Sequence, residues 1–211
     1  MNQKLLAIAA QSLWKVCVES GAYQKVFTAK EIADCVIFHA AAAGASAMAI
    51  GVLPGAGAAI AFAISTGAIW RMYIKICQII GFSFGKNKLK TISSAVISNL
   101  TANLASILAI ELATSFIPIA NIISIGVCTF FIVYRAGLVF LNTLTKLFKV
   151  KRTDYQDWSD NEWKESMKVA MAGIDQKAVL QEAKKTFTEM RKDGSLDKAK
   201  QTVDISMEDD E

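Results

Sequence analysis

The sequence is poor in the residues from which catalytic and metal sites are usually built. Its 211 residues include a single histidine, His39, so neither a histidine metal cluster nor a separate imidazole base for a serine or cysteine nucleophile is available in the usual form. The cysteines are scattered through apolar stretches, with no close pair typical of a zinc or redox motif: Cys17, Cys35, Cys77 and Cys128. We therefore expect a non-enzymatic protein without a metal, in which His39 is a buried hydrogen-bonding residue and the cysteines are free buried thiols.

Two glycine-containing segments lack residues that nucleotide binding requires. Residues 55–60 begin like a dinucleotide-binding turn, but the third small residue and an acid about twenty positions later are missing. Residues 81–87 are one residue too short between the glycines for a phosphate-binding loop, and Asn87 stands where a magnesium-binding Ser or Thr belongs. The sequence therefore predicts no cofactor.

Charged residues are absent from two long stretches, residues 35–70 and 112–134, and each stretch contains one of the two prolines. Proline is tolerated in the first turn of a helix but disrupts its interior. We interpret each stretch as part of a helical hairpin whose tip lies at the proline; the tip residues are Pro54, Gly55, Gly57 and Pro118. Residues 91–110 and 112–134 are long enough to cross a bilayer, and the arms of the first hairpin fit a shallow insertion as well as a full span.

The two hairpins are related by an offset of 64 residues. This offset aligns Pro54 with Pro118 and places an aromatic–arginine pair at the same point of each copy. The sequence thus predicts an all-α fold of duplicated apolar helical hairpins, with about four core helices. The repeat anchors are Trp70, Arg71, Tyr134 and Arg135.

The residue pattern divides the chain into three segments. Residues 1–34 are predicted to form an amphipathic N-terminal segment whose helix ends near Gly21, and residues 35–150 an apolar hairpin domain embedded in a membrane. Residues 151–211 form a charged tail, in which a capping-box pattern at residues 159–162 predicts a helix that ends at Gly173. A second tail helix is expected from about Gln176 to Asp193, and residues 195–211 are expected to be a disordered acidic end.

Positive charge gathers at the ends of the predicted hairpin arms and is nearly absent from their tips. Residues 1–150 carry twelve Lys and Arg against four Asp and Glu (+8), whereas residues 151–211 carry eleven against fifteen (−4). In so apolar a context this asymmetry favours anionic lipid over nucleic acid as the partner, and the positive-inside rule places both termini in the cytoplasm. The predicted membrane or lipid-interface residues are Lys75, Lys86, Lys88, Lys90, Arg135, Lys146, Lys149, Lys151 and Arg152.

Several short motifs within residues 35–150 carry a family resemblance. These are residues 53–57, 70–73, 76–81 and 85–86, followed by residues 116–118 and 133–137. Together they resemble the small helical domain of unknown function found on the C-terminal side of Era-like GTPases and in some bacterial inner-membrane proteins. The resemblance implies a bacterial inner-membrane module that works with a GTPase or another partner in trans. It implies no activity and no catalytic residue, and the Ala-rich first hairpin departs from the more aliphatic family pattern.

Three functional hypotheses follow from these features. The first is a non-enzymatic, membrane-associated helical module, a scaffold or accessory to a GTPase or other protein that binds its tail. The second is an effector that inserts its Ala/Gly-rich hairpins to permeabilise a membrane, starting from a soluble state. The third is a soluble helical bundle that buries its apolar surface in a homo-oligomer or against a GTPase.

Overall fold

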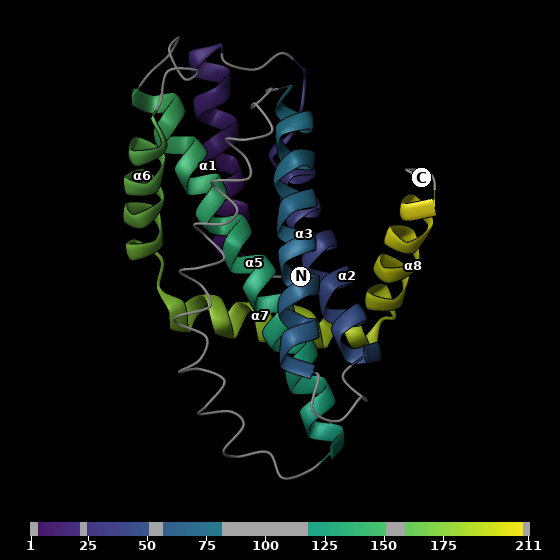
Figure 1. Ribbon diagram of the computed structural model, residues 1–211. Coiled ribbons are helices and arrows are strands. Elements are labelled where there is room, and N and C mark those ends of the chain that lie inside the picture. Colours follow the sequence, from purple (N-terminus) through teal and green to yellow (C-terminus); the bar gives the residue numbers. More distant parts are fainter. Residues whose placement is uncertain (1–3, 22–24, 51–56, 82–117, 151–158, 209–211) are drawn as a thin grey trace.

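The protein is all-α throughout the described part of the chain. The structure is a computed structural model that describes residues 4–21, 25–50, 57–81, 118–150 and 159–208. Within these ranges all regular secondary structure is helical, which confirms the predicted class (Figure 1). The helices are α1 (Lys4–Ser20), α2 (Ala29–Ile50), α3 (Gly57–Ile80), α5 (Pro118–Val150), α6 (Asp160–Ala172), α7 (Gln176–Lys192) and α8 (Ser195–Glu208).

Helix α5 forms the centre of the bundle. It contacts α1, α2, α3, α6 and α7, and nearly all of its side chains from Val127 to Phe148 are buried. Its threonines can be buried because their hydroxyls donate to carbonyl oxygens four residues earlier, as in Thr143 to Val139 at 2.7 Å. Helix α3 packs on one side of α5, where the Tyr73 ring stacks on the Phe140 ring with centroids 4.0 Å apart.

The predicted hairpin prolines agree with the helix boundaries. Helices α2 and α3 end and begin on either side of Pro54, which lies with Gly55 outside the described residues, and Gly57 is the first residue of α3. Pro118 is the first residue of α5, a position where its missing N–H costs no helical hydrogen bond. The predicted arm at residues 91–110 lies outside the described residues.

The N-terminal helix ends where the sequence predicts. Helix α1 buries Leu6, Leu13 and Cys17 and ends before Gly21, whose φ of 64° lies in the left-handed region. Helix α2 starts at Ala29, so the predicted boundary between residues 34 and 35 falls within a helix. Its side chain–backbone cap comes from Thr28, whose hydroxyl accepts from the Glu31 N–H at 3.2 Å.

The tail folds onto the bundle as three helices. The predicted capping box is present at the start of α6, where Ser159 and Glu162 cap each other, and Gly173 ends the helix as expected. Helix α7 matches the second predicted tail helix and is followed by Gly194. The prediction of disorder from residue 195 is wrong for α8, because Leu196 and Ala199 give that helix a buried face that packs against α2.

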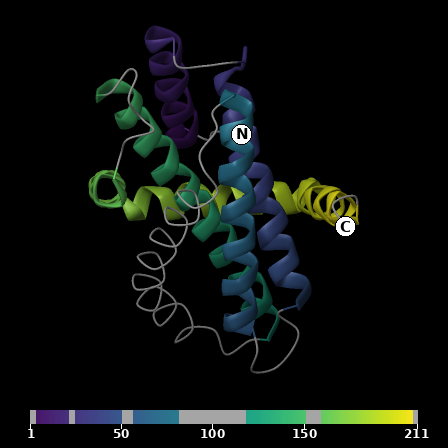
Figure 2. The ribbon, with the colours of Figure 1, turned by 45° about the horizontal axis from the view of Figure 1, so that its top comes forward.

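Helix α7 lies across the long helices instead of alongside them. Figures 1 and 2 show α7 crossing α5 while α2, α3 and α5 continue past it. Phe187 of α7 lies at Gly44 of α2 and Gly126 of α5. The part that extends beyond this level on one side consists of residues 45–50 of α2, residues 118–125 of α5 and the first turns of α3, and we call it the apolar end. It contains no charged residue.

Candidate functional site

The crossing of α7 over α2 and α5 is built around one aromatic side chain. Phe187 is 1% exposed and lies where Gly44 of α2 approaches Gly126 of α5. A Cβ atom at Gly44 would lie 2.9 Å from Phe187 Cε2, and one at Gly126 would lie 3.0 Å from Phe187 Cζ. The ring also packs edge-on against Phe130, with centroids 5.6 Å apart. The two glycines therefore form a notch that Phe187 fills.

A carboxylate fixes the rotation of α7 at this crossing. The Tyr134 hydroxyl donates to Glu182 Oε1 at 2.6 Å, and the backbone N–H of Leu5 lies 3.1 Å from both Glu182 oxygens. Helix α7 is thus tied to α5 and to the start of α1 by charge-assisted hydrogen bonds. Glu182 contacts Tyr134, midway along α5, and Phe187 lies at Phe130 and Gly126, nearer the start of α5.

The contacts of Glu182 and Phe187 also decide where the basic residues of α7 lie. Lys177, Lys184 and Arg191 are spaced by seven residues, so they share one flank of the helix. That flank is on the side of Phe187, opposite Glu182, and it borders the apolar end of the bundle. We call these three residues the basic row. Lys185 and Lys192 are turned about 100° further round the helix and point away from the bundle.

The apolar end presents uncharged surface next to the basic row. Phe62 is 44% exposed, and Ala49 and Ala63 are exposed as well. Gly126 and Gly44 mark the level of α7, so α5 extends about 12 Å and α2 about 9 Å beyond it, at 1.5 Å per residue.

Three of the predicted basic interface residues lie at the other end of the bundle. Lys75 near the end of α3 and Lys149 near the end of α5 are exposed, and Lys146 is partly exposed. All three lie at the end of the bundle opposite the apolar end (Figure 1). Lys86, Lys88, Lys90, Lys151 and Arg152 lie outside the described residues.

Arg135, which was predicted to lie at the lipid interface, is buried inside the packed bundle. Its side chain is only 2% exposed because it sits midway along the central helix. Within the described part of the chain, its Nε and Nη1 atoms have no hydrogen-bond partner. Its counterpart in the predicted repeat, Arg71, is exposed, and Trp70 is half-buried whereas Tyr134 is buried. The equivalent positions thus have different environments, and the repeat stays a prediction.

The histidine and cysteines are packing residues. His39 is half-buried, and its Nδ1 atom lies 2.8 Å from the Cys35 carbonyl oxygen, which agrees with the predicted hydrogen-bonding role. The four cysteines are buried thiols outside any disulfide, as predicted. Burial raises the pKa of Cys17 to about 12 and so keeps that thiol protonated and unreactive at neutral pH. Among the described residues, no three His, Cys, Asp or Glu side chains gather as metal ligands.

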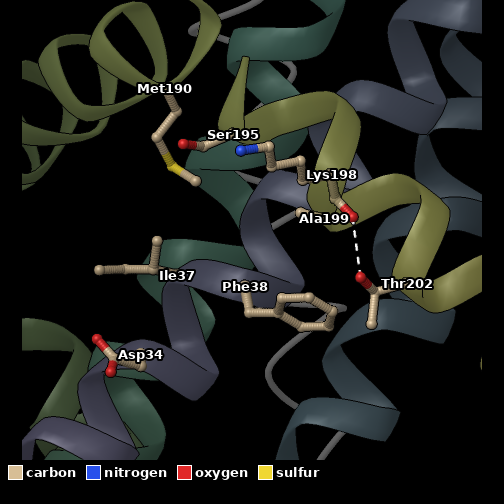
Figure 3. A pocket seen from close by; sticks show the side chains of 8 residues that line it. All are labelled: Asp34, Ile37, Phe38, Met190, Ser195, Lys198, Ala199 and Thr202. Atoms are coloured by element: carbon tan, nitrogen blue, oxygen red, sulfur yellow. Dashed lines mark hydrogen bonds between the residues drawn. The ribbon is translucent and has the colours of Figure 1, made fainter. Parts of the chain in front are cut away.

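A hollow of about 310 Å³ lies between α2 and α8, at the end of α7 (Figure 3). Its apolar lining comes from Ile37, Phe38, Met190 and Ala199. Polar groups at its edge bond within the protein: Asp34 pairs with Lys30, and the Thr202 hydroxyl donates to the Lys198 carbonyl oxygen at 2.9 Å. We therefore regard the hollow as part of the packing interface between α8 and α2 and not as a ligand site.

The sequence analysis missed the residues that organise this site. Glu182, Phe187 and the basic row all belong to the tail, which was assigned to an external partner. A signal was available, since Glu182 and Glu189 repeat at seven residues on one flank and Lys177, Lys184 and Arg191 on the other. Such a division of charge indicates a helix whose two flanks face different surroundings.

No family model, curated protein or solved structure matches this chain. The resemblance to the GTPase-associated helical domain therefore stays a prediction, and the functional argument rests on the residues of the chain itself.

Proposed function

We propose that this protein is a non-enzymatic, membrane-associated helical module that binds anionic membranes as a packed bundle. The observation that carries the proposal is the position of α7. This charged helix crosses α2 and α5, the two helices that contain the long apolar segments, partway along their length. Two helical segments, Ala29–Ile50 and Ile125–Lys149, are long and apolar enough to cross a membrane. Both are in contact with other helices of the bundle, and most of Ile125–Lys149 is buried there.

The charge on α7 is incompatible with a bilayer surrounding α2 and α5 in this arrangement. A span that began at Pro118 would place the crossing about 12 to 18 Å deep, near the middle of a hydrocarbon core about 30 Å thick. Exposed residues of α7 such as Lys177, Lys185 and Lys192 would then lie in hydrocarbon. Each would cost about 2.5–3.5 kcal/mol there on insertion scales. A span that includes the apolar end therefore requires α7 to leave its notch, and the packed state favours attachment without such a span.

The membrane-permeabilising hypothesis uses the same notch in a different way. Such an effector would start from the packed bundle and release α7 before its hairpins insert. The GTPase partner rests on the family resemblance alone, because the tail helices are packed against the bundle and none of their described contacts identifies a protein partner.

A second candidate function is the soluble, oligomerising bundle. The deep burial of α5 favours it, because a central helix shielded by others needs no lipid. An oligomer would still have to cover the apolar end of each bundle.

Flotation of the purified, detergent-free protein with vesicles separates these functions. We expect it to float with equal mixtures of phosphatidylglycerol and phosphatidylcholine, to float poorly with phosphatidylcholine alone, and to be released by alkaline carbonate. Failure to float with either vesicle, together with an oligomer in solution, would favour the soluble bundle. Resistance to carbonate would show integral insertion and contradict attachment as a packed bundle. Release of a trapped dye would favour the permeabilising effector.

A further inference from the structure

We infer that the apolar end enters a single leaflet of an anionic bilayer as far as α7, where the basic row contacts the lipid headgroups. This inference rests on the proposed function and adds the surface, the depth and the headgroup contacts. The exposed surface around Ala49 and Phe62 contacts the acyl region of a lipid leaflet.

The dimensions of the apolar end fit this depth. It extends about 9–12 Å beyond α7 along α2 and α5, and interfacial helices bury their apolar faces about 5–10 Å into the boundary between headgroups and acyl chains. The same distance is far short of the roughly 30 Å needed to cross the hydrocarbon core. Insertion would therefore stop where α7 begins.

The charges of α7 are placed where they would hold the helix at the level of the lipid headgroups. The helix carries five Lys and Arg against two Glu, and the basic row occupies the flank next to the apolar end. Both glutamates, Glu182 and Glu189, lie on the opposite flank, where Glu182 bonds to Tyr134 and Leu5. An anionic leaflet approaching from the apolar end therefore meets basic side chains and no glutamate of α7.

This orientation differs from the one expected from the predicted lipid-interface residues. Lys75 and Lys149 lie at the other end of the bundle, so they face water when the apolar end is inserted. The headgroup contacts come instead from the tail, the segment that the sequence analysis reserved for a protein partner.

The first test reverses charge on the two flanks of the same helix. The variant Lys177→Glu/Arg191→Glu changes the basic row, and the matched control Lys185→Glu/Lys192→Glu makes the same change in net charge on the outward face. Lys or Arg side chains near an anionic surface contribute about 1 kcal/mol each, so we expect the first variant to bind phosphatidylglycerol-containing vesicles at least about tenfold more weakly. The control should bind with a much smaller loss. Circular dichroism and thermal unfolding must show both variants folded.

The second test measures depth. Ala49→Cys places a label in the apolar end, and Gly67→Cys places one on α3 at an open position further from the tip, where an added Cβ meets nothing within 4 Å. The native thiols are buried, so an environment-sensitive fluorophore reacts selectively with the new cysteine. With vesicles, the label at residue 49 should shift its emission to the blue and be quenched by spin-labelled lipid, whereas the label at residue 67 should not.

The two tests separate the inference from the proposed function. If the protein does not bind vesicles at all, the proposed function fails. If it binds but both flanks of α7 respond equally to charge reversal, or the label at residue 49 stays in water, the protein is membrane-associated by another surface and the inference is overturned. If the labels at residues 49 and 67 both enter lipid, insertion is deeper than α7 allows and the inference is likewise overturned.

Discussion

Helices α3 and α5 share a short residue pattern and lie in opposite environments in the molecule. Each begins at or just after a predicted hairpin tip, and each carries an aromatic–arginine pair at the same offset. Yet α5 is enclosed by α1, α2, α3, α6 and α7, whereas α3 lies at the edge with Arg71 and the start of its outer face exposed. Of these two helices, α5 contains the segment that is long and apolar enough to cross a membrane, and α5 is also the helix that the bundle buries. Apolar composition shows that a helix avoids water, and its neighbours decide whether protein or lipid replaces the water.

The sharpest way to test this contrast is to remove one phenylalanine from each helix. Phe140 of α5 is fully buried and stacked on Tyr73, so Phe140→Ala should lower the free energy of unfolding by about 3–5 kcal/mol. Phe62 of α3 is 44% exposed, so Phe62→Ala should change stability by less than about 0.5 kcal/mol. Denaturant titrations measure both, and equal losses would contradict the assignment of α3 to the edge. Phe62→Ala should also weaken vesicle binding, by up to about tenfold.

A glycine in each helix gives a second pair. A Cβ at Gly137 of α5 would lie 2.5 Å from Val36 Cγ1 and 3.0 Å from Val36 Cγ2, and a β-branched side chain cannot turn aside. Gly137→Ala should therefore destabilise the protein by about 1–3 kcal/mol. Gly67 of α3 has open space around it, so Gly67→Ala should stabilise the protein by about 0.5–1 kcal/mol through helix propensity. Thermal unfolding of the two variants should shift in opposite directions, and shifts of the same sign would refute the comparison.

The arginines of the two helices give the third pair. Arg135 is buried with two nitrogens lacking a partner among the described residues, and an unsatisfied buried group costs about 1–3 kcal/mol. Replacing it with the apolar chain of Met should therefore raise the free energy of unfolding by about 1 kcal/mol. Arg71→Met should leave it unchanged within about 0.5 kcal/mol. A loss of stability in Arg135→Met would show that the guanidinium has a stabilising partner.

Local signals in the sequence predicted the element boundaries well. The capping box at Ser159, the glycine after α1 and the proline that begins α5 act within one or two turns, so they can be recognised without knowing the fold. The contact between Phe187 and the glycine pair could not be predicted in this way. Gly44 and Gly126 are far apart in the sequence, and only the crossing of α2 and α5 turns them into a notch.

The same reasoning explains why Arg135 and α8 lie in environments that differ from those expected. Arg135 follows an uncharged stretch and so looks like the end of a membrane span, but α5 continues as a helix to Val150. Helix α8 has few apolar residues, yet Leu196 and Ala199 suffice because α2 offers them a surface. Both outcomes depend on which elements meet in space, which composition does not record.

The central claim is that the protein meets the membrane with α7 still seated in its notch. Hydrogen–deuterium exchange of the vesicle-bound protein tests it directly, because amides exchange when a helix detaches and frays. We expect the amides around Phe187 in α7 to keep the protection they have in solution, while those near Ala49 at the end of α2 become more protected. Loss of protection along α7 on vesicle binding, with α2 and α5 protected throughout, would contradict the account and show that the bundle opens to insert its hairpins.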